Sequence, residues 1–255
     1  MSRESIHEVV GATSIDVDGH SLVLVPPPAG PAVLISDGSR RVVLVADLHL
    51  GKAASFGALG RPIAGDLARR IARADLDRLS TLVRQTRATE LGVLGDLIHN
   101  RAARDPGVMS EVASWRAEPL IAPLTFTLVR GNHDRHAGDP PSSWGMRVVS
   151  GPWGLLASTP GPGGEPRPAV VGLHEPALVP GSLAIAGHIH PMVTLGGRER
   201  SACFAIRSGL MIVPAFGSFT GGASIATLPP DIAPTRVLAV GPGRVIEAPR
   251  ALWAR

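Results

Sequence analysis

The chain has 255 residues, of which 44% are hydrophobic and 18% charged, and its formal net charge is +4 at pH 7. This composition is typical of a globular protein with a sizeable core and excludes a disordered chain. No apolar run approaches a membrane span, and residues 1–5 lack an apolar signal-peptide core, so we expect a cytoplasmic protein with no membrane partner. Cys203 is the only cysteine, which excludes an internal disulfide and a metal site built on several thiolates.

The excess of basic residues is compatible with a polyanionic partner such as nucleic acid. An arginine-rich composition without any basic patch would give the same net charge. Lys52 is the only lysine. Aromatic residues make up 4% of the chain and tyrosine is absent, so we do not expect an extended base-stacking platform.

The first 65 residues predict strands followed by a loop. Short β-like runs at residues 21–25 and 33–35 are interpreted as edge strands separated by turns. Residues 42–45 form an unbroken aliphatic run, which is typical of a strand buried on both faces of a sheet. If that strand persists, Asp47 and His49 point to the same side because side chains alternate along a strand. The Gly- and Ala-rich residues 51–65 predict a loop long enough to cover a site.

Strand-like and helical patterns alternate from residue 66 to residue 134. The apolar spacing over residues 66–85 predicts an amphipathic helix. A second helix is predicted over residues 106–118, with Asp105 as its N-cap and Pro106 in its first turn. Strand-like runs at residues 90–94 and 124–129 end in the sequences GD and RGNHD, respectively.

Strand-like segments dominate the rest of the chain. Residues 158–168, rich in Pro and Gly, predict a loop or mobile insert. The predicted strands at 169–173 and 183–186 end in His174 and in the sequence GHIH at 187–190, and further strand-like segments lie at 204–206, 210–213, 224–228 and 237–240. This order predicts an α/β protein in which a double β-sheet sandwich is flanked by helices, forming a single domain over residues 1–255 without a separate cap domain.

Polar side chains follow five of these strand-like runs, and they include five of the nine histidines. Carboxylate oxygens, amide oxygens and imidazole nitrogens suit first-row divalent ions. Seven candidate ligands are too many for one ion and fit two ions that share a bridging carboxylate. These candidates are Asp47, His49, Asp96, Asn132, His174, His188 and His190. The alternative is a set of hydrogen-bonded core histidines and turn residues.

The motifs D-x-H, G-D, G-N-H-D, H and G-H-x-H, in this order from Asp47 to His190, resemble those of the calcineurin-like metallophosphoesterase superfamily. All five motifs are intact. The resemblance implies a double-sheet sandwich with flanking helices, in agreement with the pattern of elements.

The resemblance also implies a role for each motif residue. The roles are a first ion held by Asp47, His49 and His190, a second ion held by Asn132, His174 and His188, and a bridge between the ions made by Asp96. Two such ions, about 3.5–4 Å apart, would clamp a phosphate and acidify a bridging water, so that hydroxide attacks phosphorus in line with the leaving oxygen. His133 would give the leaving group its proton, and Asp134 would orient His133 from behind.

Three longer stretches narrow the resemblance to the bacterial ligase-associated DNA damage response endonucleases (PdeM family). They are DLHLGKA with the following Phe56, HEP together with AGHIHP, and PAFGSFTGG, and the match extends over about residues 42–222. The resemblance implies a manganese-dependent phosphodiesterase and DNA endonuclease in DNA repair, with DNA as substrate and DNA ligase, helicase and exonuclease as partners. The same ligands also accept iron or zinc.

Some assignments remain open at the level of sequence. Lys52 either contacts a substrate phosphate or is an ordinary surface lysine, and Arg130 either contacts a phosphate or pairs with Asp134. His99 either lines the pocket or is structural. A small-molecule phosphoesterase acting on nucleotides or a pyrophosphate-linked lipid precursor would use the same metal site with a closed pocket. A non-catalytic DNA-binding or scaffold protein would have lost a metal ligand or His133, and none of these residues is lost.

Overall fold

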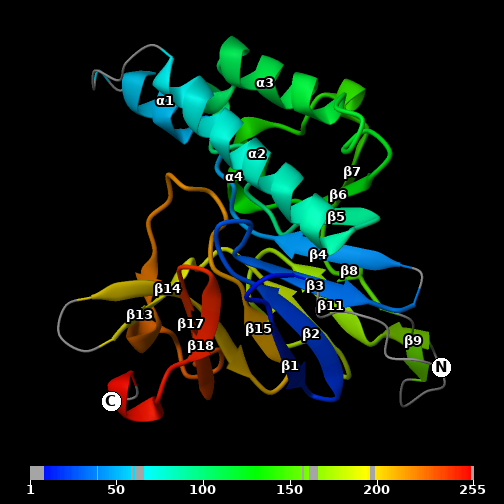
Figure 1. The fold of residues 1–255 in the computed structure, drawn as a ribbon, viewed down its shortest axis with the longest axis vertical. Coiled ribbons are helices and arrows are strands. Elements are labelled where there is room, and N and C mark those ends of the chain that lie inside the picture. Colours follow the sequence, from blue (N-terminus) through cyan, green and yellow to red (C-terminus); the bar gives the residue numbers. More distant parts are fainter. Residues whose placement is uncertain are drawn as a thin grey trace.

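The computed structural model describes residues 9–38, 40–58, 60, 66–156, 158–160, 166–195 and 199–253. In this part of the chain, two large β-sheets pack against each other, and helices cover the outer face of the first sheet (Figure 1). The predicted α/β double-sheet sandwich with flanking helices is therefore confirmed. Among the residues described, every helix is too short or too polar to cross a membrane.

The first sheet, within the described ranges, has seven strands that follow one another in chain order. They are β1 (Thr13–Val17), β2 (His20–Val25), β3 (Ala32–Ser36), β4 (Arg41–Val45), β5 (Glu90–Val93), β6 (Thr125–Val129) and β7 (Met146–Val149). Strands β1 to β4 pair antiparallel, and β4 to β7 pair parallel. The interpretation of residues 21–25 and 33–35 as edge strands is wrong, because β1, which the sequence analysis missed, pairs with β2.

The second sheet is mixed, and its parallel strands β11, β12 and β15 lie next to one another. Its strands are β8 (Trp153–Gly154), β11 (Val170–Leu173), β12 (Leu183–Ala186), β13 (Pro191–Thr194), β14 (Arg200–Arg207), β15 (Leu210–Ile212), β16 (Ala223–Ser224), β17 (Arg236–Gly241) and β18 (Arg244–Glu247). The prediction of a strand over residues 224–228 is wrong except at Ser224, because β16 ends there and a 3₁₀ turn follows it.

A small two-stranded sheet replaces most of the loop predicted at residues 158–168. Strands β9 (Ser158–Pro160) and β10 (Pro166–Pro168) pair antiparallel, so the prediction of a loop is wrong at both ends. Residues 161–165 lie outside the described part of the chain. The proline content hid these strands, because proline is tolerated in short edge strands but weakens the sequence signal.

The α-helices are α1 (Lys52–Ala58), α2 (Leu67–Thr86), α3 (Pro106–Arg116) and α4 (Asn132–Ala137), and the 3₁₀ turns are η2 (Arg101–Ala103), η3 (Ser142–Trp144), η4 (Ile225–Thr227) and η5 (Arg250–Leu252). The two long predicted helices are confirmed as α2 and α3. Asp105 caps α3 as predicted, since its Oδ1 accepts the N–H groups of Gly107 (2.9 Å) and Val108 (3.2 Å). The prediction of a loop over residues 51–65 is wrong for Lys52–Ala58, which form α1. Residues 59 and 61–65 lie outside the described part of the chain.

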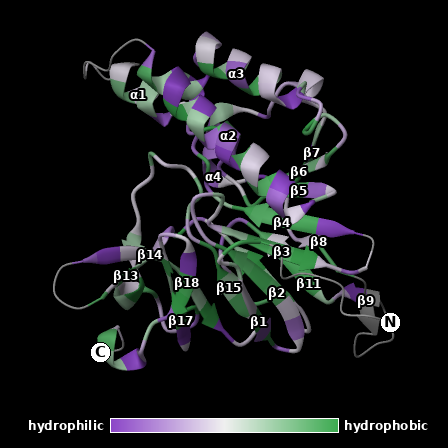
Figure 2. Cartoon of the chain, viewed as in Figure 1, coloured by the Kyte–Doolittle hydropathy of each residue, from purple (hydrophilic) through white to green (hydrophobic). Residues whose placement is uncertain are grey.

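Successive side chains along the buried strands point to opposite faces of the first sheet, so a hydrophobic core forms on each face. Val43 and Val45 of β4 pack toward the helices, whereas Val42 and Leu44 pack toward the second sheet. The strands are mostly hydrophobic, whereas α2 alternates between hydrophobic and hydrophilic residues (Figure 2). Strand β4 is therefore buried on both faces, as its unbroken apolar run predicted.

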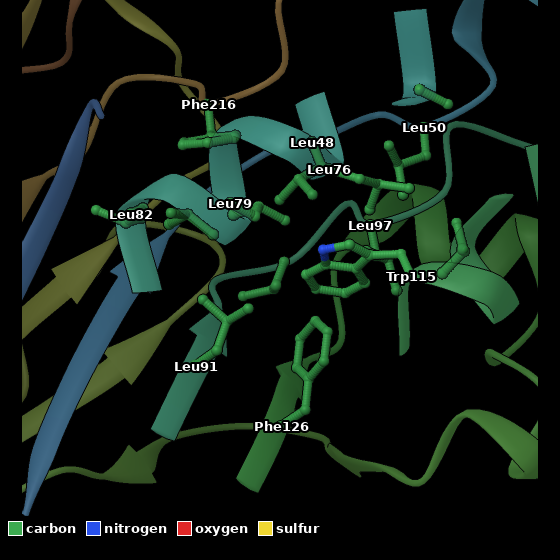
Figure 3. Close-up of a cluster of buried hydrophobic side chains, with 14 of the residues drawn as sticks. Leu48, Leu50, Leu76, Leu79, Leu82, Leu91, Leu97, Trp115, Phe126 and Phe216 are labelled. Carbon is green, nitrogen blue, oxygen red and sulfur yellow. The ribbon is translucent and has the colours of Figure 1, made fainter. Parts of the chain in front are cut away.

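The core beneath the helices fixes α2 and α3 on the sheet. Leu76, Leu79 and Leu82 of α2 point toward the strands that carry Leu91 and Phe126 (Figure 3). On α3, the Trp115 ring meets Phe126 edge-on at 6.1 Å, and its Nε1 donates a hydrogen bond to Ser80 of α2 at 2.9 Å. These contacts bury the apolar faces of both helices.

We predict that Leu79→Ala lowers the free energy of unfolding by about 2–5 kcal/mol, because Leu79 is fully buried and its truncation leaves a cavity. Urea denaturation followed by circular dichroism measures the loss. Arg70→Ala, on the exposed face of the same helix, should change the free energy of unfolding by less than about 0.5 kcal/mol. Equal effects of the two substitutions would contradict the packing described here.

Candidate metal centre

The carboxyl ends of parallel strands bring the candidate residues to one place. Strands β4, β5 and β6 run parallel in the first sheet, and β11 and β12 run parallel in the second. Every one of these strands is followed within five residues by at least one of the predicted side chains. Open α/β sheets have their ligand sites at such edges.

A first cluster consists of Asp47, His49 and His190, whose ligand atoms lie within 4.8 Å of one another. The Nε2 atoms of His49 and His190 are 3.3 Å apart, and Nε2 of His190 is 3.4 Å from Oδ1 of Asp47. The resemblance of the motifs implied the same three residues as ligands of the first ion.

A second cluster consists of Asp96, His174 and His188, with Asn132 beside them. Oδ1 of Asn132 lies 2.8 Å from Nε2 of His174 and 3.1 Å from Nδ1 of His188. The two histidine nitrogens are themselves 3.1 Å apart. These atoms converge as expected for the second ion and its bridge.

Asp96 lies between the two clusters. Its Oδ2 is 3.7 Å from Nε2 of His49 in the first cluster, and its Oδ1 is 3.5 Å from Nε2 of His174 in the second. Oδ1 also accepts the backbone N–H of His133 at 2.9 Å. One carboxylate therefore faces both groups of imidazoles, which is the arrangement that a bridging ligand requires.

Left-handed backbone, rather than strand alternation, aims most of these side chains. The residues with positive φ are Asp47 (55°), His49 (47°), Asp96 (55°), His188 (70°) and His190 (50°). Strand β4 ends at Val45, so the argument from alternation was wrong although the two side chains do converge. Non-glycine residues pay about 1–2 kcal/mol each for this conformation. Such strain is concentrated at functional sites in proteins.

Two motif glycines make room for ligands from other motifs. A Cβ on Gly95 would overlap the ring of His174, and Gly95 also has a φ of 83°. A Cβ on Gly187 would lie 2.7 Å from Oδ2 of Asp47. Because these approaches exclude any side chain, the glycines of the G-D and G-H-x-H motifs are required by packing around the site.

The donor set fits divalent cations. Asp47 is fully buried, its Oδ2 accepts the N–H of His188 at 2.8 Å, and its Oδ1 has no hydrogen-bond partner in the described part of the chain. Nδ1 of His174 donates to the carbonyl of Leu94 and Nδ1 of His190 to the carbonyl of Gly221, both at 2.9 Å. Each ring therefore uses Nδ1 to bond the backbone and turns Nε2 toward its cluster, which is the orientation of a metal-binding imidazole.

Burial and crowding change the pKa values of the cluster. Burial, reinforced by His190 and His133, lowers the pKa of His49 to about 2, so this imidazole is neutral at physiological pH. Burial lowers the pKa of His190 as well, but its interaction with Asp47 outweighs burial and leaves the pKa above its ordinary value. Burial, with nearby Asp47, raises the pKa of Asp96. A cation among these groups would favour the ionised carboxylates and the neutral imidazoles.

His133 and His99 lie beside the first cluster. Nδ1 of His133 is hydrogen-bonded to the backbone carbonyl of His99, and the two rings stack at 4.6 Å. Nδ1 of His99 lies 3.0 Å from Nδ1 of His49. Burial, together with His133, lowers the pKa of His99 to about 4. The sequence did not decide whether His99 lines the pocket or is structural, and the structure places its ring against both His49 and His133.

The Asp134 carboxylate accepts hydrogen bonds from backbone N–H groups rather than from the His133 ring. Its Oδ2 accepts the N–H groups of Asp96 (2.8 Å) and Gly131 (2.9 Å), and its Oδ1 those of Leu97 (3.0 Å) and Ile98 (3.4 Å). The expectation that it orients the His133 ring is wrong, because the His99 carbonyl holds that ring. Asp134 instead fixes the turn that carries Asp96.

Lys52 and Arg130 differ in their availability to a substrate. Lys52 begins α1, and its backbone N–H donates to the carbonyl of His49 at 3.1 Å, so it lies close to the first cluster. The guanidinium of Arg130 is engaged by both carboxylate oxygens of Asp139, at 2.9 and 2.6 Å. The pairing of Arg130 with Asp134 that the sequence left open is replaced by the one with Asp139.

The fold and the two clusters together define a metal-binding site of the kind found in hydrolases of phosphoester bonds. Residues 40–163 match the calcineurin-like phosphoesterase family. The chain is similar to the nuclease MPE of Pseudomonas putida, with 36% sequence identity, a TM-score of 0.70, and coverage of 93% of this chain and 100% of that one. The chain belongs to the calcineurin-like phosphoesterase family. A comparison with curated proteins gave no match.

We predict that Asp134→Asn lowers the free energy of unfolding of the metal-free protein on the order of 2–3 kcal/mol, because an amide NH₂ in place of either oxygen would face two backbone N–H donors. Thermal and urea denaturation measure this loss. Asp139→Asn is the matched control, since it removes a partly exposed ion pair and should cost less than about 1 kcal/mol. An unchanged stability of Asp134→Asn would contradict the role assigned to this carboxylate.

Proposed function

We propose that this protein is a metal-dependent phosphodiesterase that cleaves DNA, acting as a single domain over residues 1–255. The observation that carries the proposal is the Asp96 carboxylate between two clusters of ligand atoms. Similarity to a nuclease over 93% of the chain supports DNA as the substrate class. The net charge of +4 agrees with a polyanionic substrate.

The proposed ligands are those of the two clusters. Asp47, His49 and His190 would hold one divalent ion, Asn132, His174 and His188 would hold the other, and Asp96 would contact both. Bound ions would supply positive charge to the phosphate oxygens and lower the pKa of water at the site. Oxygen and imidazole donors without thiolate suit Mn²⁺, which we propose as the physiological metal, with iron or zinc as alternatives.

His133 is the proposed general acid. Its backbone N–H is tied to Asp96, and its Nδ1 is tied to the His99 carbonyl, so its position relative to the clusters is fixed. Because a carbonyl can only accept, Nδ1 carries the proton of that bond and Nε2 is left to exchange a proton with the leaving oxygen. Asp134 acts on the reaction only by holding the turn of Asp96.

The biological setting follows from the resemblance of the motifs. We propose a role in cytoplasmic DNA repair, with DNA ligase, helicase and exonuclease as partners. The alternative function is a small-molecule phosphoesterase that uses the same metal centre on nucleotides or pyrophosphate-linked compounds. The two functions differ in whether a DNA strand or only a small diester is cleaved.

We predict that His133→Ala slows cleavage of DNA by about 10²–10⁴-fold, because the alkoxide leaving group needs a proton. Hydrolysis of bis-(4-nitrophenyl) phosphate should fall far less, since its aryl leaving group departs readily without protonation. Steady-state rates on both substrates test this difference. His136→Ala, on the exposed face of the same helix, should alter neither rate. A parallel loss on both substrates would exclude the role of general acid.

We predict that metal-stripped protein is inactive and that added Mn²⁺ restores hydrolysis of the aryl diester and of single- or double-stranded DNA. Asp96→Asn should reduce the restored rate by more than about 100-fold, because it removes the charge shared by both clusters. Asp139→Asn serves as the control. Cleavage of the aryl diester without cleavage of DNA would favour the small-molecule alternative.

A further inference from the structure

The metal centre is flanked by a pocket on each side. The first, which we call the Arg200 pocket, has a volume of about 330 Å³ and adjoins His190 of the first cluster. The second, the Arg135 pocket, has a volume of about 220 Å³ and adjoins His174 of the second cluster. A substrate with groups on both sides of its phosphate could occupy both pockets, whereas a terminal phosphate monoester would occupy one.

The Arg200 pocket shares His190 and its hydrogen-bond partner Gly221 with the candidate metal centre. It lies at β13 and β14, at the left side of the second sheet in Figure 1. The carbonyl of Gly221 accepts the Nδ1 proton of His190, and the carbonyl of Gly222 accepts a hydrogen bond from Nη2 of Arg200, both at 2.9 Å. Two successive carbonyls therefore hold a candidate metal ligand and the guanidinium.

Arg200 differs from the arginines of the other pocket in lacking a carboxylate partner among the described residues. In the Arg135 pocket, Arg130 is paired with Asp139 and Arg135 with Glu175. Among the described residues, no carboxylate lies within ion-pair distance of Arg200, whose recorded partner is a backbone carbonyl. Its exposed guanidinium is therefore not neutralised by a described carboxylate and has further N–H donors for an anion.

The remaining wall of the Arg200 pocket is mostly apolar. It includes Pro191, Met192, Pro214 and Ala215, with Thr220 as a polar neighbour. The Thr220 hydroxyl is used within the loop, since it donates to the carbonyl of Gly217 at 2.9 Å. An apolar surface next to a cation suits a nucleoside, because the base and sugar contact the wall and the adjoining phosphate meets the guanidinium.

We propose that the Arg200 pocket binds the nucleotide on one side of the scissile phosphate, with Arg200 contacting the next phosphate of the strand. This inference rests on the proposed cleavage of DNA and specifies how the strand lies across the centre. It makes Arg200 a specificity-determining residue that favours an internal phosphodiester over a small diester.

The test compares Arg200→Ala with the wild type on a single-stranded oligonucleotide and on bis-(4-nitrophenyl) phosphate, both with Mn²⁺. The ratio of kcat/KM for the oligonucleotide to that for the aryl diester should fall about tenfold, which corresponds to one charge-assisted hydrogen bond. The slope of log kcat/KM for the oligonucleotide against log salt should become shallower by about 0.7, the value for one lost contact to single-stranded nucleic acid. Arg200→Lys should recover the slope and only part of the ratio, because it keeps the charge without the planar fork.

Arg207→Ala is the matched control. Arg207 lies at the opposite end of β14 and also donates to a backbone carbonyl, that of Pro230 at 3.0 Å, so its loss should change neither the ratio nor the slope. An unchanged ratio and slope for Arg200→Ala, in a wild type that does cleave the oligonucleotide, would overturn this inference alone. A wild type that hydrolyses the aryl diester but not the oligonucleotide would overturn the proposed function and the inference with it.

Discussion

The Asp96 carboxylate is the group on which the site depends, because it faces both clusters of ligand atoms. Its position is set by several independent contacts. Asp134 accepts the N–H of Asp96 and of the next two residues, and the N–H of His133 binds Oδ1 of Asp96. The position of this carboxylate between the two clusters is therefore fixed by loops from two neighbouring parallel strands, β5 and β6. A change in either loop would move the carboxylate relative to both clusters.

The double-sheet architecture stabilises an otherwise costly arrangement of backbone. The five left-handed residues of the site follow strands β4, β5 and β12, and all residues of these strands except Arg41 are buried. The first sheet is packed on one face by helices and on the other by the second sheet. This packing fixes the strand ends, so local strain of about 1–2 kcal/mol per residue can be retained where the candidate ligands converge.

Short motifs after apolar runs drew attention to the candidate residues, and the resemblance of those motifs to a known superfamily implied their grouping. The structure brings Asp47, His49 and His190 together, as that grouping requires. The alternation rule failed for Asp47 and His49 because left-handed turns are not visible as a pattern of residue types. The contacts of Asp134 and the place of His99 depend on tertiary structure. Strand β1 and helix α1 were missed because short elements carry a weak periodic signal.

The most direct test of a bridging Asp96 is the number of Mn²⁺ ions bound per chain and their magnetic coupling, measured by titration and electron paramagnetic resonance. The account predicts two ions per chain with an exchange-coupled signal, because ions that share a carboxylate lie about 3.5–4 Å apart. Asp96→Asn should abolish the coupled signal. One bound ion, or two ions with independent signals in the wild type, would contradict the account.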